Sequence, residues 1–329
     1  MEEISSPQDS GAPFGSRLPV EKIAEGIAKV RQEIKKTIVG QDEMIELMLV
    51  GLLSKGHILL EGVPGIAKTL TSKLFAKSIH TGFSRIQFTP DLMPADVLGT
   101  SVFKSGEFEF KKGPIFSNVI LIDEINRAPA KTQSAMFEVM EERQVTMDGV
   151  TYPMEAPFMV LATQNPIDSE GTYRLPEAQM DRFLFKIHLG LPNLEEEILI
   201  LQNRGSETES EPKVTPVLSG EEVIQFQNWT SEIRVEEKLL QYIATIVVKT
   251  RSHASIYAGA SPRASLAIFR ASQAMAAMDG RDFVLPDDIK RAAIPAMRHR
   301  IILNPEKEME GVSADLILEG IIQSIEIPR

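Results

Sequence analysis

The sequence contains no cysteine and only one tryptophan among its 329 residues. Without thiols the chain can form no disulfide bridge, no thiolate zinc cluster, no redox dithiol and no cysteine nucleophile. A cysteine-free chain fits a reducing compartment, and we therefore expect a cytoplasmic protein. Hydrophobic residues make up 43% of the chain and charged residues 25%, which is ordinary for a globular protein and excludes a mainly disordered or collagen-like chain.

Long apolar runs and an excess of basic residues are also missing. No run approaches the roughly 18–20 residues of a transmembrane helix, so we expect no membrane span; the longest, such as Val119–Ile122 and Phe158–Ala162, have the length of strands. The first residues are acidic and polar, unlike a signal peptide, and we predict that residues 1–18 form a disordered tail. With 46 acidic and 35 basic residues the formal net charge is −11, which argues against broad electrostatic binding to nucleic acid as a function.

Strands and helices alternate along the first 190 residues. Short apolar runs predict strands over residues 57–61, 85–89, 118–123, 158–164 and 183–189. Apolar residues at spacings of three and four predict helices over residues 20–38, 41–53, 68–79 and 130–142. The alternation predicts an α/β fold, with a parallel sheet covered by helices on both faces.

Two segments interrupt this alternation. Residues 101–112 alternate around Ser105-Gly106, and residues 144–154 alternate around Asp148-Gly149. Asp-Gly is a strong signal for a two-residue turn, so both segments are predicted to be β-hairpins. They are either decoration of the surface or parts of the functional machinery.

Beyond Pro192 the strand pattern is expected to stop. Helical patterns occur next over residues 194–202, 220–228, 236–251, 262–278 and 286–294. The polar segment 203–216 is predicted to be a flexible connection. We therefore divide the chain into an α/β domain over residues 19–192 and an all-helical domain over residues 193–329.

The segment HILLEGVPGIAKTLTSKLF contains a strand, a glycine-rich turn and the start of a helix. The turn consists of Gly62, Val63, Pro64, Gly65, Ile66, Ala67, Lys68 and Thr69. Glycines let backbone N–H groups fold around phosphate oxygens, and the helix N-terminus adds the positive end of its dipole. Lys68 would reach the β- and γ-phosphates, and Thr69 would place its hydroxyl on Mg²⁺. The general phosphate-loop pattern has glycine where this chain has Ala67, and an ordinary turn before a helix is the alternative.

An apolar strand ends on Asp123-Glu124, in the position where α/β sheets bind ligands. Asp123 would hold Mg²⁺ together with Thr69, and Glu124 would polarise the attacking water as a general base. We expect this pair on the strand next to the one that enters the glycine-rich turn. The alternative is a charged strand end in front of a helix.

Three further residues are candidates for contacts with a nucleotide. Asn165 comes after an apolar run and would bind the attacking water or the γ-phosphate, unless it is only a turn residue before a proline. Arg182 ends a short helix and could reach a neighbouring subunit's site; the alternative is a surface pair with Asp181 or Glu177. Arg263 begins a helix, where a cation is unfavourable unless a phosphate or another anion accompanies it.

Taken together, these residues resemble the AAA+ ATPases, and within them the MoxR family. The resemblance covers residues 20–329. Its most specific segments are VGQ at 39–41, GVPGIAKT at 62–69, LIDEINRAP at 121–129, ATQNP at 162–166, EGTYRLPEAQMDRF at 170–183 and GASPRA at 259–264. It implies a P-loop NTPase core with a five-stranded parallel sheet and a C-terminal helical lid domain.

The resemblance also implies a role for each motif. It identifies residues 62–69 as Walker A, in which alanine at position 67 is the expected MoxR form, and residues 123–124 as Walker B. It implies that Asn165 is sensor 1, Arg182 the arginine finger and Arg263 sensor 2, with Val39 and Gly40 lying against the adenine. It matches the two hairpins to the helix-2 insert and the pre-sensor-1 hairpin, which such rings usually place near a central pore. Many relatives have Tyr-Pro at residues 173–174, so the role of Arg174 is open.

The implied function is ATP hydrolysis with Mg²⁺ by a homo-oligomeric, hexameric ring. Such rings are thought to act as chaperones that mature protein clients, often with a partner that carries a von Willebrand factor A (VWA) domain. Three alternatives stay open: the motor subunit of a metal chelatase, a nucleic-acid-stimulated motor of the same clade, and a scaffold that scarcely hydrolyses nucleotide.

Overall fold

The computed structural model describes residues 18–104, 106–165, 173, 175–205 and 214–328. The tail predicted over residues 1–18 lies outside the described residues except for Leu18, as do Arg174 and most of the predicted flexible connection. Within the described ranges, no helix combines the length and the apolar character that crossing a bilayer requires.

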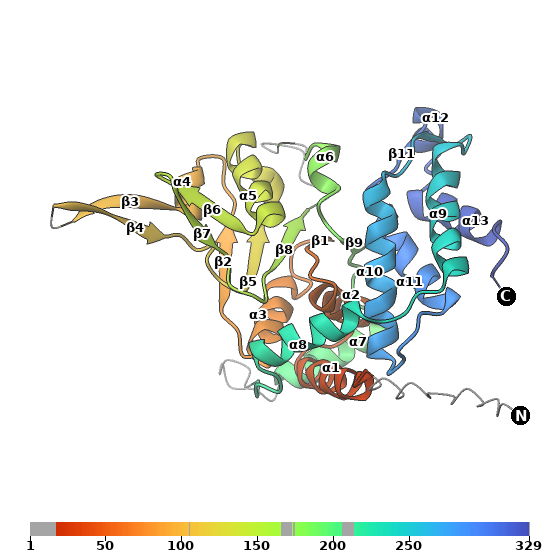
Figure 1. Cartoon of the computed structure of the whole chain (residues 1–329), viewed down its shortest axis with the longest axis horizontal. Helices are drawn as coiled ribbons and strands as arrows, with labels where there is room; N and C mark the ends of the chain where they lie inside the picture. Colours follow the sequence, from red (N-terminus) through yellow and green to blue (C-terminus); the bar gives the residue numbers. More distant parts are fainter. Residues whose placement is uncertain (1–17, 105, 166–172, 174, 206–213, 329) are drawn as a thin grey trace, which may run out of the picture.

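Five parallel strands form the central sheet (Figure 1). They are β1 (Ile58–Glu61), β2 (Phe83–Gln87), β5 (Val119–Asp123), β8 (Met159–Gln164) and β9 (Phe185–His188). Their order is β2-β5-β8-β1-β9. The predicted parallel sheet is therefore confirmed, but one detail is wrong: β8 lies between β1 and β5, so the acidic pair is not on the strand next to the glycine-rich turn.

Both faces of the sheet are buried. Alternate residues of β5 and β8 belong to two different apolar clusters, one on each side of the sheet. The helices α1 (Val20–Lys35), α2 (Asp42–Leu53) and α3 (Lys68–Ser78) pack on one side. The helices α4 (Pro94–Leu98) and α5 (Ala130–Glu142) pack on the other. This double burial explains why the central strands read as continuous apolar runs.

Two hairpins extend from this domain, as predicted. β3 (Gly99–Lys104) pairs with β4 (Glu107–Lys112) in a long ribbon that projects far from the sheet (Figure 1). β6 (Gln144–Met147) pairs with β7 (Val150–Pro153). Asp148 and Gly149 both have positive φ, as the two-residue turn predicted there requires.

The C-terminal part is mainly helical. After the short α6 (Glu177–Met180) and β9, its helices are α7 (Leu194–Gly205), α8 (Gly220–Ser231), α9 (Glu237–Arg251), α10 (Pro262–Met278), α11 (Pro286–Met297), α12 (Pro305–Met309) and α13 (Ala314–Gln323). The expectation that strands stop after Pro192 is wrong, because β10 (Ile256–Ala258) and β11 (Ile302–Leu303) form an antiparallel ribbon.

The two parts of the chain share one hydrophobic core. A single apolar cluster includes residues of α1, α2, α3 and β1 together with residues of α8, α9, α10, α11 and α13. Within it α10 contacts α1 and α2 directly. The helical part is thus packed against the sheet domain, and the boundary between residues 192 and 193 stays a prediction.

Candidate functional site

The glycine-rich turn wraps around Lys68 at the start of α3. Gly65 and Ala67 have positive φ, so the turn needs residues that tolerate the left-handed conformation. The Nζ of Lys68 donates a hydrogen bond to the carbonyl oxygen of Gly62 at 2.7 Å. A Cβ on Gly62 would lie 2.6 Å from the Ile66 side chain, so a larger residue does not fit there without rearrangement. The turn and its lysine therefore form a compact cradle, and its binding of phosphate stays a prediction.

The acidic pair is held at the end of β5 by neighbouring polar side chains. Asp123 is 7% exposed and accepts a hydrogen bond of 2.6 Å from the Nε of Arg85. Glu124 has a positive φ, and its Oε2 accepts a hydrogen bond of 2.8 Å from the Nε2 of Gln87 and lies 3.1 Å from the Nε of Arg127. Arg85 and Gln87 belong to β2, the edge strand next to β5, so side chains of β2 position both carboxylates.

Thr163 connects the acidic pair to the strand between it and the turn. Its hydroxyl donates to Asp123 Oδ1 at 3.3 Å and accepts a hydrogen bond of 2.9 Å from the Glu124 backbone N–H. On the other side, Thr163 is in register with Leu60 of β1. Strand β8 thus lies between the turn and the acidic pair, and the hydroxyl of its Thr163 contacts the acidic pair.

The electrostatics indicate that the turn and the acids face each other. Burial lowers the pKa of Lys68. The negative charges of Asp123 and Glu124 act in the opposite direction and raise this pKa, but burial has the larger effect. Asn165, only 8% exposed, comes immediately after β8 and so lies between them. The structure therefore brings Lys68, the acidic pair and Asn165 together at the carboxyl edge of the sheet, where β-sheets of this type bind ligands.

The oxygen ligands at this edge fit Mg²⁺ only in the company of a phosphate. Within the described ranges no group of three or more His, Cys, Asp or Glu side chains could hold a metal ion. Mg²⁺ typically takes one or two carboxylates and fills its other positions with water and phosphate oxygens. The Asp123 carboxylate and the Thr69 hydroxyl, on the residue after Lys68, would supply the protein's share.

Val39 and Gly40 lie at the same edge as the turn. Gly40 has φ +67°, and Gln41 after it, the residue before α2, donates a hydrogen bond of 3.3 Å to the Gly190 carbonyl oxygen. The adjacent Leu189 bonds through its backbone to Glu61, the residue before the turn. This segment therefore borders the cradle, as an adenine contact would require.

Arg182 and Arg263 lie at the opposite end of β1. Residues 182–184 run beside the start of this strand, because the Leu184 N–H donates to the His57 carbonyl oxygen at 2.8 Å. Both arginines bind the same carboxylate: Arg182 Nε lies 2.6 Å from one oxygen of Glu141, and Arg263 Nη2 lies 2.5 Å from the other. Arg182 therefore has a carboxylate partner, although it is neither Asp181 nor Glu177. A strand of four residues spans about 13 Å, so β1 separates both arginines from the glycine-rich turn of their own chain by roughly that length.

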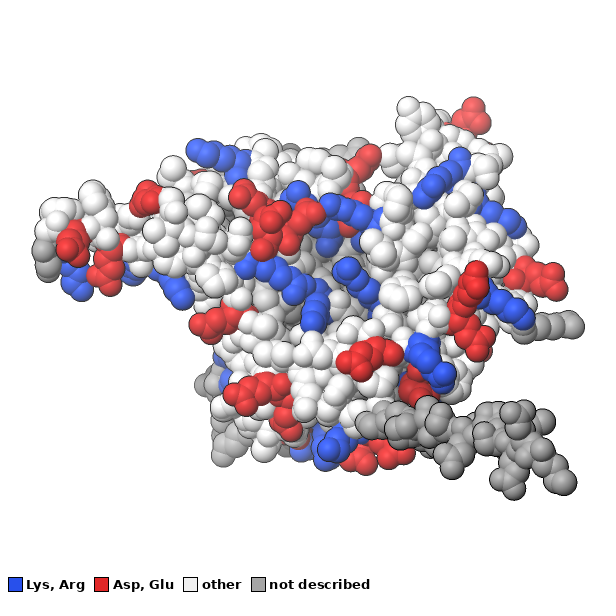
Figure 2. Space-filling model, viewed as in Figure 1, with Lys and Arg blue, Asp and Glu red and all other residues white. Residues whose placement is uncertain are grey.

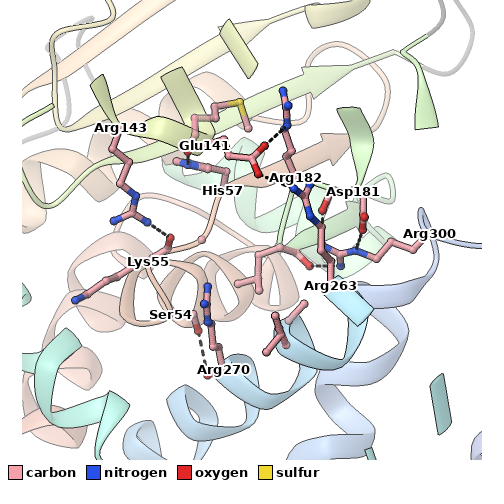
Figure 3. A pocket seen from close by; sticks show the side chains of 15 residues that line it. Ser54, Lys55, His57, Glu141, Arg143, Asp181, Arg182, Arg263, Arg270 and Arg300 are labelled. Carbon is pink, nitrogen blue, oxygen red and sulfur yellow. Dashed lines mark hydrogen bonds and ion pairs between the residues drawn. The ribbon is translucent and has the colours of Figure 1, made fainter. Parts of the chain in front are cut away.

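The two arginines line a cavity of about 320 Å³ between the sheet domain and the helices. Figure 2 shows Lys and Arg side chains around a hollow at the centre of this face, and Figure 3 shows the residues inside. Six cations line it: Lys55, Arg143, Arg182, Arg263, Arg270 and Arg300. Two carboxylates accompany them: Glu141 binds Arg182 and Arg263, and Asp181 binds Arg300 at 2.6 Å. The cavity is therefore strongly cationic, in a chain whose net charge is −11.

Several residues at these sites have no counterpart in the sequence prediction, among them Arg85, Gln87, Glu141 and Thr163. Arg85 and Gln87 are polar residues two apart on a strand, a spacing that places both on one face. Knowing that this strand lies beside β5 would have identified them as partners of the acidic pair, but strand order is not readable from these residues. Glu141 is one of several acids near the end of α5, and nothing local distinguishes it.

The comparisons with known proteins agree with this geometry. Residues 57–185 match the family described as ATPase family associated with various cellular activities (AAA), and residues 248–321 match the AAA lid domain. The uncharacterized protein YeaC of Bacillus subtilis is 46% identical over 92% of this chain and 95% of its own. Chaperone MoxR1 of Mycobacterium tuberculosis is 45% identical over 90% of this chain and 81% of its own. The crystal structure of a candidate ATPase from Cytophaga hutchinsonii superposes with a TM-score of 0.88 at 44% identity, covering 94% of this chain and 97% of that one.

Proposed function

The chain belongs to the MoxR family of AAA+ ATPases and hydrolyses ATP, and from this we propose that it works as a ring in which each subunit completes its neighbour's active site. The observation that carries the proposal is the separation of the motifs. Lys68, Asp123 and Glu124 lie at the carboxyl edge of the sheet, whereas Arg182 and Arg263 lie at the amino end of β1. A second subunit is the direct way to bring both sets to one phosphate.

Within one subunit each group of residues would have its own part in the chemistry. The backbone of residues 62–67 and Lys68 would bind the β- and γ-phosphates, and Val39 with Gly40 would border the adenine. Glu124 would orient and deprotonate the attacking water, with Asn165 as a second hydrogen-bonding partner for that water. Bound Mg²⁺, held by Thr69 and Asp123, would neutralise charge on the phosphate oxygens.

The neighbour would supply the remaining positive charge. Arg182 and Arg263 are held together by Glu141, so both guanidinium groups are presented at one place. They would stabilise the charge that develops on the transferred phosphoryl group, an effect that typically raises the rate about 10³–10⁵-fold when an arginine is supplied by another chain. Both arginines lie at the end of β1 that is away from the phosphate loop of their own chain. We therefore propose that Arg263 acts in trans, like Arg182.

The work done with this ATP is proposed to be the remodelling of protein clients, carried out by a hexamer with a VWA-domain partner. Two facts support a protein client. A relative that is 45% identical carries the name chaperone. The β3–β4 ribbon exposes Phe103 and Phe108 to 64% and 75%, which is an apolar surface that a polypeptide could cover.

Subunit mixing tests the shared site. We expect Lys68→Ala and Arg182→Ala proteins to be nearly inactive alone, the second by about 10³-fold or more. A mixture of the two should regain activity, because a subunit with an intact Lys68 can meet a neighbour with an intact Arg182. Steady-state phosphate release at a fixed total concentration measures this, and Arg234→Ala, an exposed arginine far from both sites in sequence, is the control.

Two results would contradict the proposal. If Arg182→Ala hydrolysed ATP at the native rate, the trans role of Arg182 would be wrong. If the mixture were as inactive as its components while each variant still assembled, the two residues would belong to one subunit's site.

A further inference from the structure

Helix α7 has apolar side chains that are not buried. None of its described side chains is buried. Leu194, Ile198, Leu199 and Leu201 are between 46% and 77% exposed, and Leu191, just before the helix, is 74% exposed. A short helix in a protein owes most of its stability to the packing of its apolar face. A helix of this composition is therefore expected to be covered by a partner.

The position of α7 indicates which partner. It comes directly after β9, and its Glu196 carboxylate lies so close to Gly40 that a Cβ there would be 2.6 Å from Oε1. Gly190, shortly before the helix, accepts the hydrogen bond from Gln41. Helix α7 thus borders the nucleotide site. In the ring proposed above, on which this inference rests, the neighbour's Arg182 approaches that same site, so the neighbour covers the surface around it.

The surface that the neighbour brings has a matching character. On α10, Arg263, Leu266 and Arg270 recur at spacings of three and four, which places them on one face of the helix. Leu266 is 54% exposed, and all three line the cationic cavity (Figure 3). This face of α10 therefore presents Arg263, the exposed Leu266 and then Arg270.

Three cations of this cavity have no carboxylate partner among the described residues: Lys55, Arg143 and Arg270. Lys55 Nζ donates to the Asn228 side-chain oxygen at 3.2 Å, and Arg143 donates to the Lys55 carbonyl oxygen at 2.6 Å. Burial lowers the pKa of Arg143, and the charge of Arg270 lowers it further. Like charges held together in this way favour an anionic group from outside the subunit.

Helix α7 offers such anions beside its apolar face. Its first turn contains Glu195, Glu196 and Glu197. Glu196 accepts a hydrogen bond of 2.9 Å from the Asn193 N–H and so serves its own helix start. Glu195 and Glu197 are exposed and make no ion pair with any described residue.

We propose that α7 of one subunit docks on the α10 face of the next, with Glu195 and Glu197 facing the neighbour's Lys55, Arg143 and Arg270 and with Leu194 near its Leu266. The occupant of this face is a second copy of the chain. The contact places the neighbour's Arg182 and Arg263 beside the nucleotide that α7 borders, and so couples assembly to completion of the active site.

Charge reversal tests the polar half of the contact. With a non-hydrolysable ATP analogue, Arg270→Glu alone and the pair Glu195→Arg with Glu197→Arg alone should each raise the concentration at which subunits assemble by about tenfold or more. Combining the three changes in one chain should recover most of that loss, because the reversed charges attract again. Sedimentation velocity measures assembly, and Glu319→Arg, the same change on the exposed side of α13, is the control that should behave like the native chain.

Cross-linking tests the contact directly and does not depend on the energetics of the variants. Because the chain has no cysteine, Leu194→Cys and Leu266→Cys can be placed in two differently tagged chains. A bis-maleimide about 10 Å long, roughly one helix diameter, should join the two chains when the nucleotide analogue is present. Leu316→Cys, 61% exposed on α13, should not be joined to Leu266→Cys.

The outcomes separate this inference from the proposed function. A native chain that stays monomeric at every concentration with nucleotide would overturn the ring, and the docking contact with it. Native assembly that is unaffected by the charge reversals, or a Leu316→Cys chain that is joined to Leu266→Cys as readily as Leu194→Cys is, would overturn the docking of α7 alone.

Discussion

At the scale of single residues, the chain uses buried polar side chains to hold its secondary structure around the sites. His57, just before β1, is one of them. Its Nε2 lies 3.0 Å from the Met140 carbonyl oxygen, and its Nδ1 accepts a hydrogen bond of 3.0 Å from the Val160 N–H. The ring therefore ties β1 to α5 and β8 and is neutral, with the proton on Nε2. Burial is the main cause that lowers the pKa of His57 to about 4; the hydrogen bond to Met140 opposes this shift, and the charge of Arg143 contributes to it.

This shift predicts a loss of stability in mild acid. Between pH 6.5 and about 4 the unfolded chain binds a proton on His57 and the folded chain does not, so the free energy of unfolding falls as the pH falls. The slope should approach about 1.4 kcal/mol per pH unit for this group, and urea denaturation at pH 7, 6, 5 and 4.5 measures it. The His57→Gln protein should have a shallower slope by that amount, whereas His80→Asn, at an exposed position with positive φ, should keep the native slope.

His299 should contribute in the same direction in both variants, because burial also holds its pKa well below the ordinary value. For this reason the comparison is between slopes and not between absolute stabilities. An unchanged slope in the His57→Gln protein would mean that this side chain is accessible to protons in the folded state.

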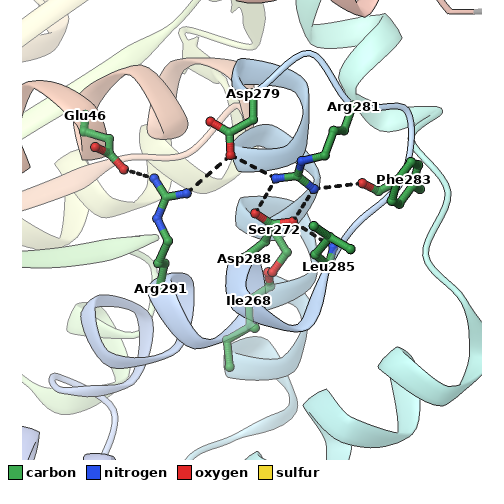
Figure 4. Close-up of polar contacts among 9 residues, drawn as sticks. All are labelled: Glu46, Ile268, Ser272, Asp279, Arg281, Phe283, Leu285, Asp288 and Arg291. Carbon is green, nitrogen blue, oxygen red and sulfur yellow. Dashed lines mark hydrogen bonds and ion pairs between the residues drawn. The ribbon is translucent and has the colours of Figure 1, made fainter. Parts of the chain in front are cut away.

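At the scale of secondary-structure elements, an ion-pair network joins the helical part to the sheet domain (Figure 4). Arg281, between α10 and α11, binds both oxygens of Asp288 at 2.8 Å and also reaches Asp279 at 2.9 Å. Arg291 lies 3.5 Å from Asp279 and also pairs with Glu46 of α2. Since α2 begins just after the segment that borders the nucleotide site, this network fixes the helices relative to that site.

Removing Arg281 should therefore destabilise the whole chain. Asp288 is 2% exposed, and the Arg281→Ala substitution would leave its charge buried with only the Leu285 N–H as a strong donor. We expect a loss of about 3 kcal/mol in the free energy of unfolding, the lower end of the usual cost of removing one partner of a buried ion pair. Urea denaturation at neutral pH measures it. The Lys290→Ala protein, which loses only an exposed pair with Asp287, should change by less than about 1 kcal/mol, and equal effects of the two substitutions would contradict the argument.

The elements also show how far sequence reasoning reaches. The ends of α5 and α10 are predicted to the residue, because local apolar spacing and proline placement determine them. The end of α11 is not: a proline at position 295 predicts a stop at Ile294, yet the helix continues to Met297 because Ala296 and Met297 are fully buried. Burial by distant parts of the chain also decides the strand order and the β10–β11 ribbon, which is too short for a pattern of its own.

The same limit applies to the site. The glycine-rich turn and the acidic pair can be singled out from the sequence because each is a continuous segment with its own chemistry, and their roles stay predictions. That Arg182 and Arg263 share Glu141, and that both lie away from Lys68, depends on how α5, α10 and β9 meet in space. No local pattern contains that information.

At the scale of the whole molecule, the glycine-rich turn and the Arg182–Arg263 pair lie at opposite ends of β1, and the β3–β4 ribbon projects away from the sheet (Figure 1). Phe103 and Phe108 lie opposite each other on the ribbon with ring centroids 5.2 Å apart. Farther back, Phe110 contacts Tyr152 of the second hairpin with centroids 4.5 Å apart, so the two hairpins are joined. An apolar pair on a projecting ribbon exposes surface to water without contributing to the core. It is therefore better explained by a contact with another chain than by stability.

This argument predicts client capture that depends on the ribbon. A Glu124→Gln protein should bind ATP without hydrolysing it and so hold an engaged client longer. With ATP it should retain a reduced and alkylated globular protein, a permanently unfolded chain, in a pull-down assay, and Phe103→Ser with Phe108→Ser should reduce the retained amount at least several-fold. The same two changes in the chain with native Glu124 should leave basal ATP hydrolysis unchanged, because both rings are exposed and far from Lys68 in the sequence.

Equal retention with and without the two rings would show that clients are held elsewhere. Stimulation of ATP hydrolysis by DNA, with a steep dependence on salt, would instead indicate a motor that acts on nucleic acid.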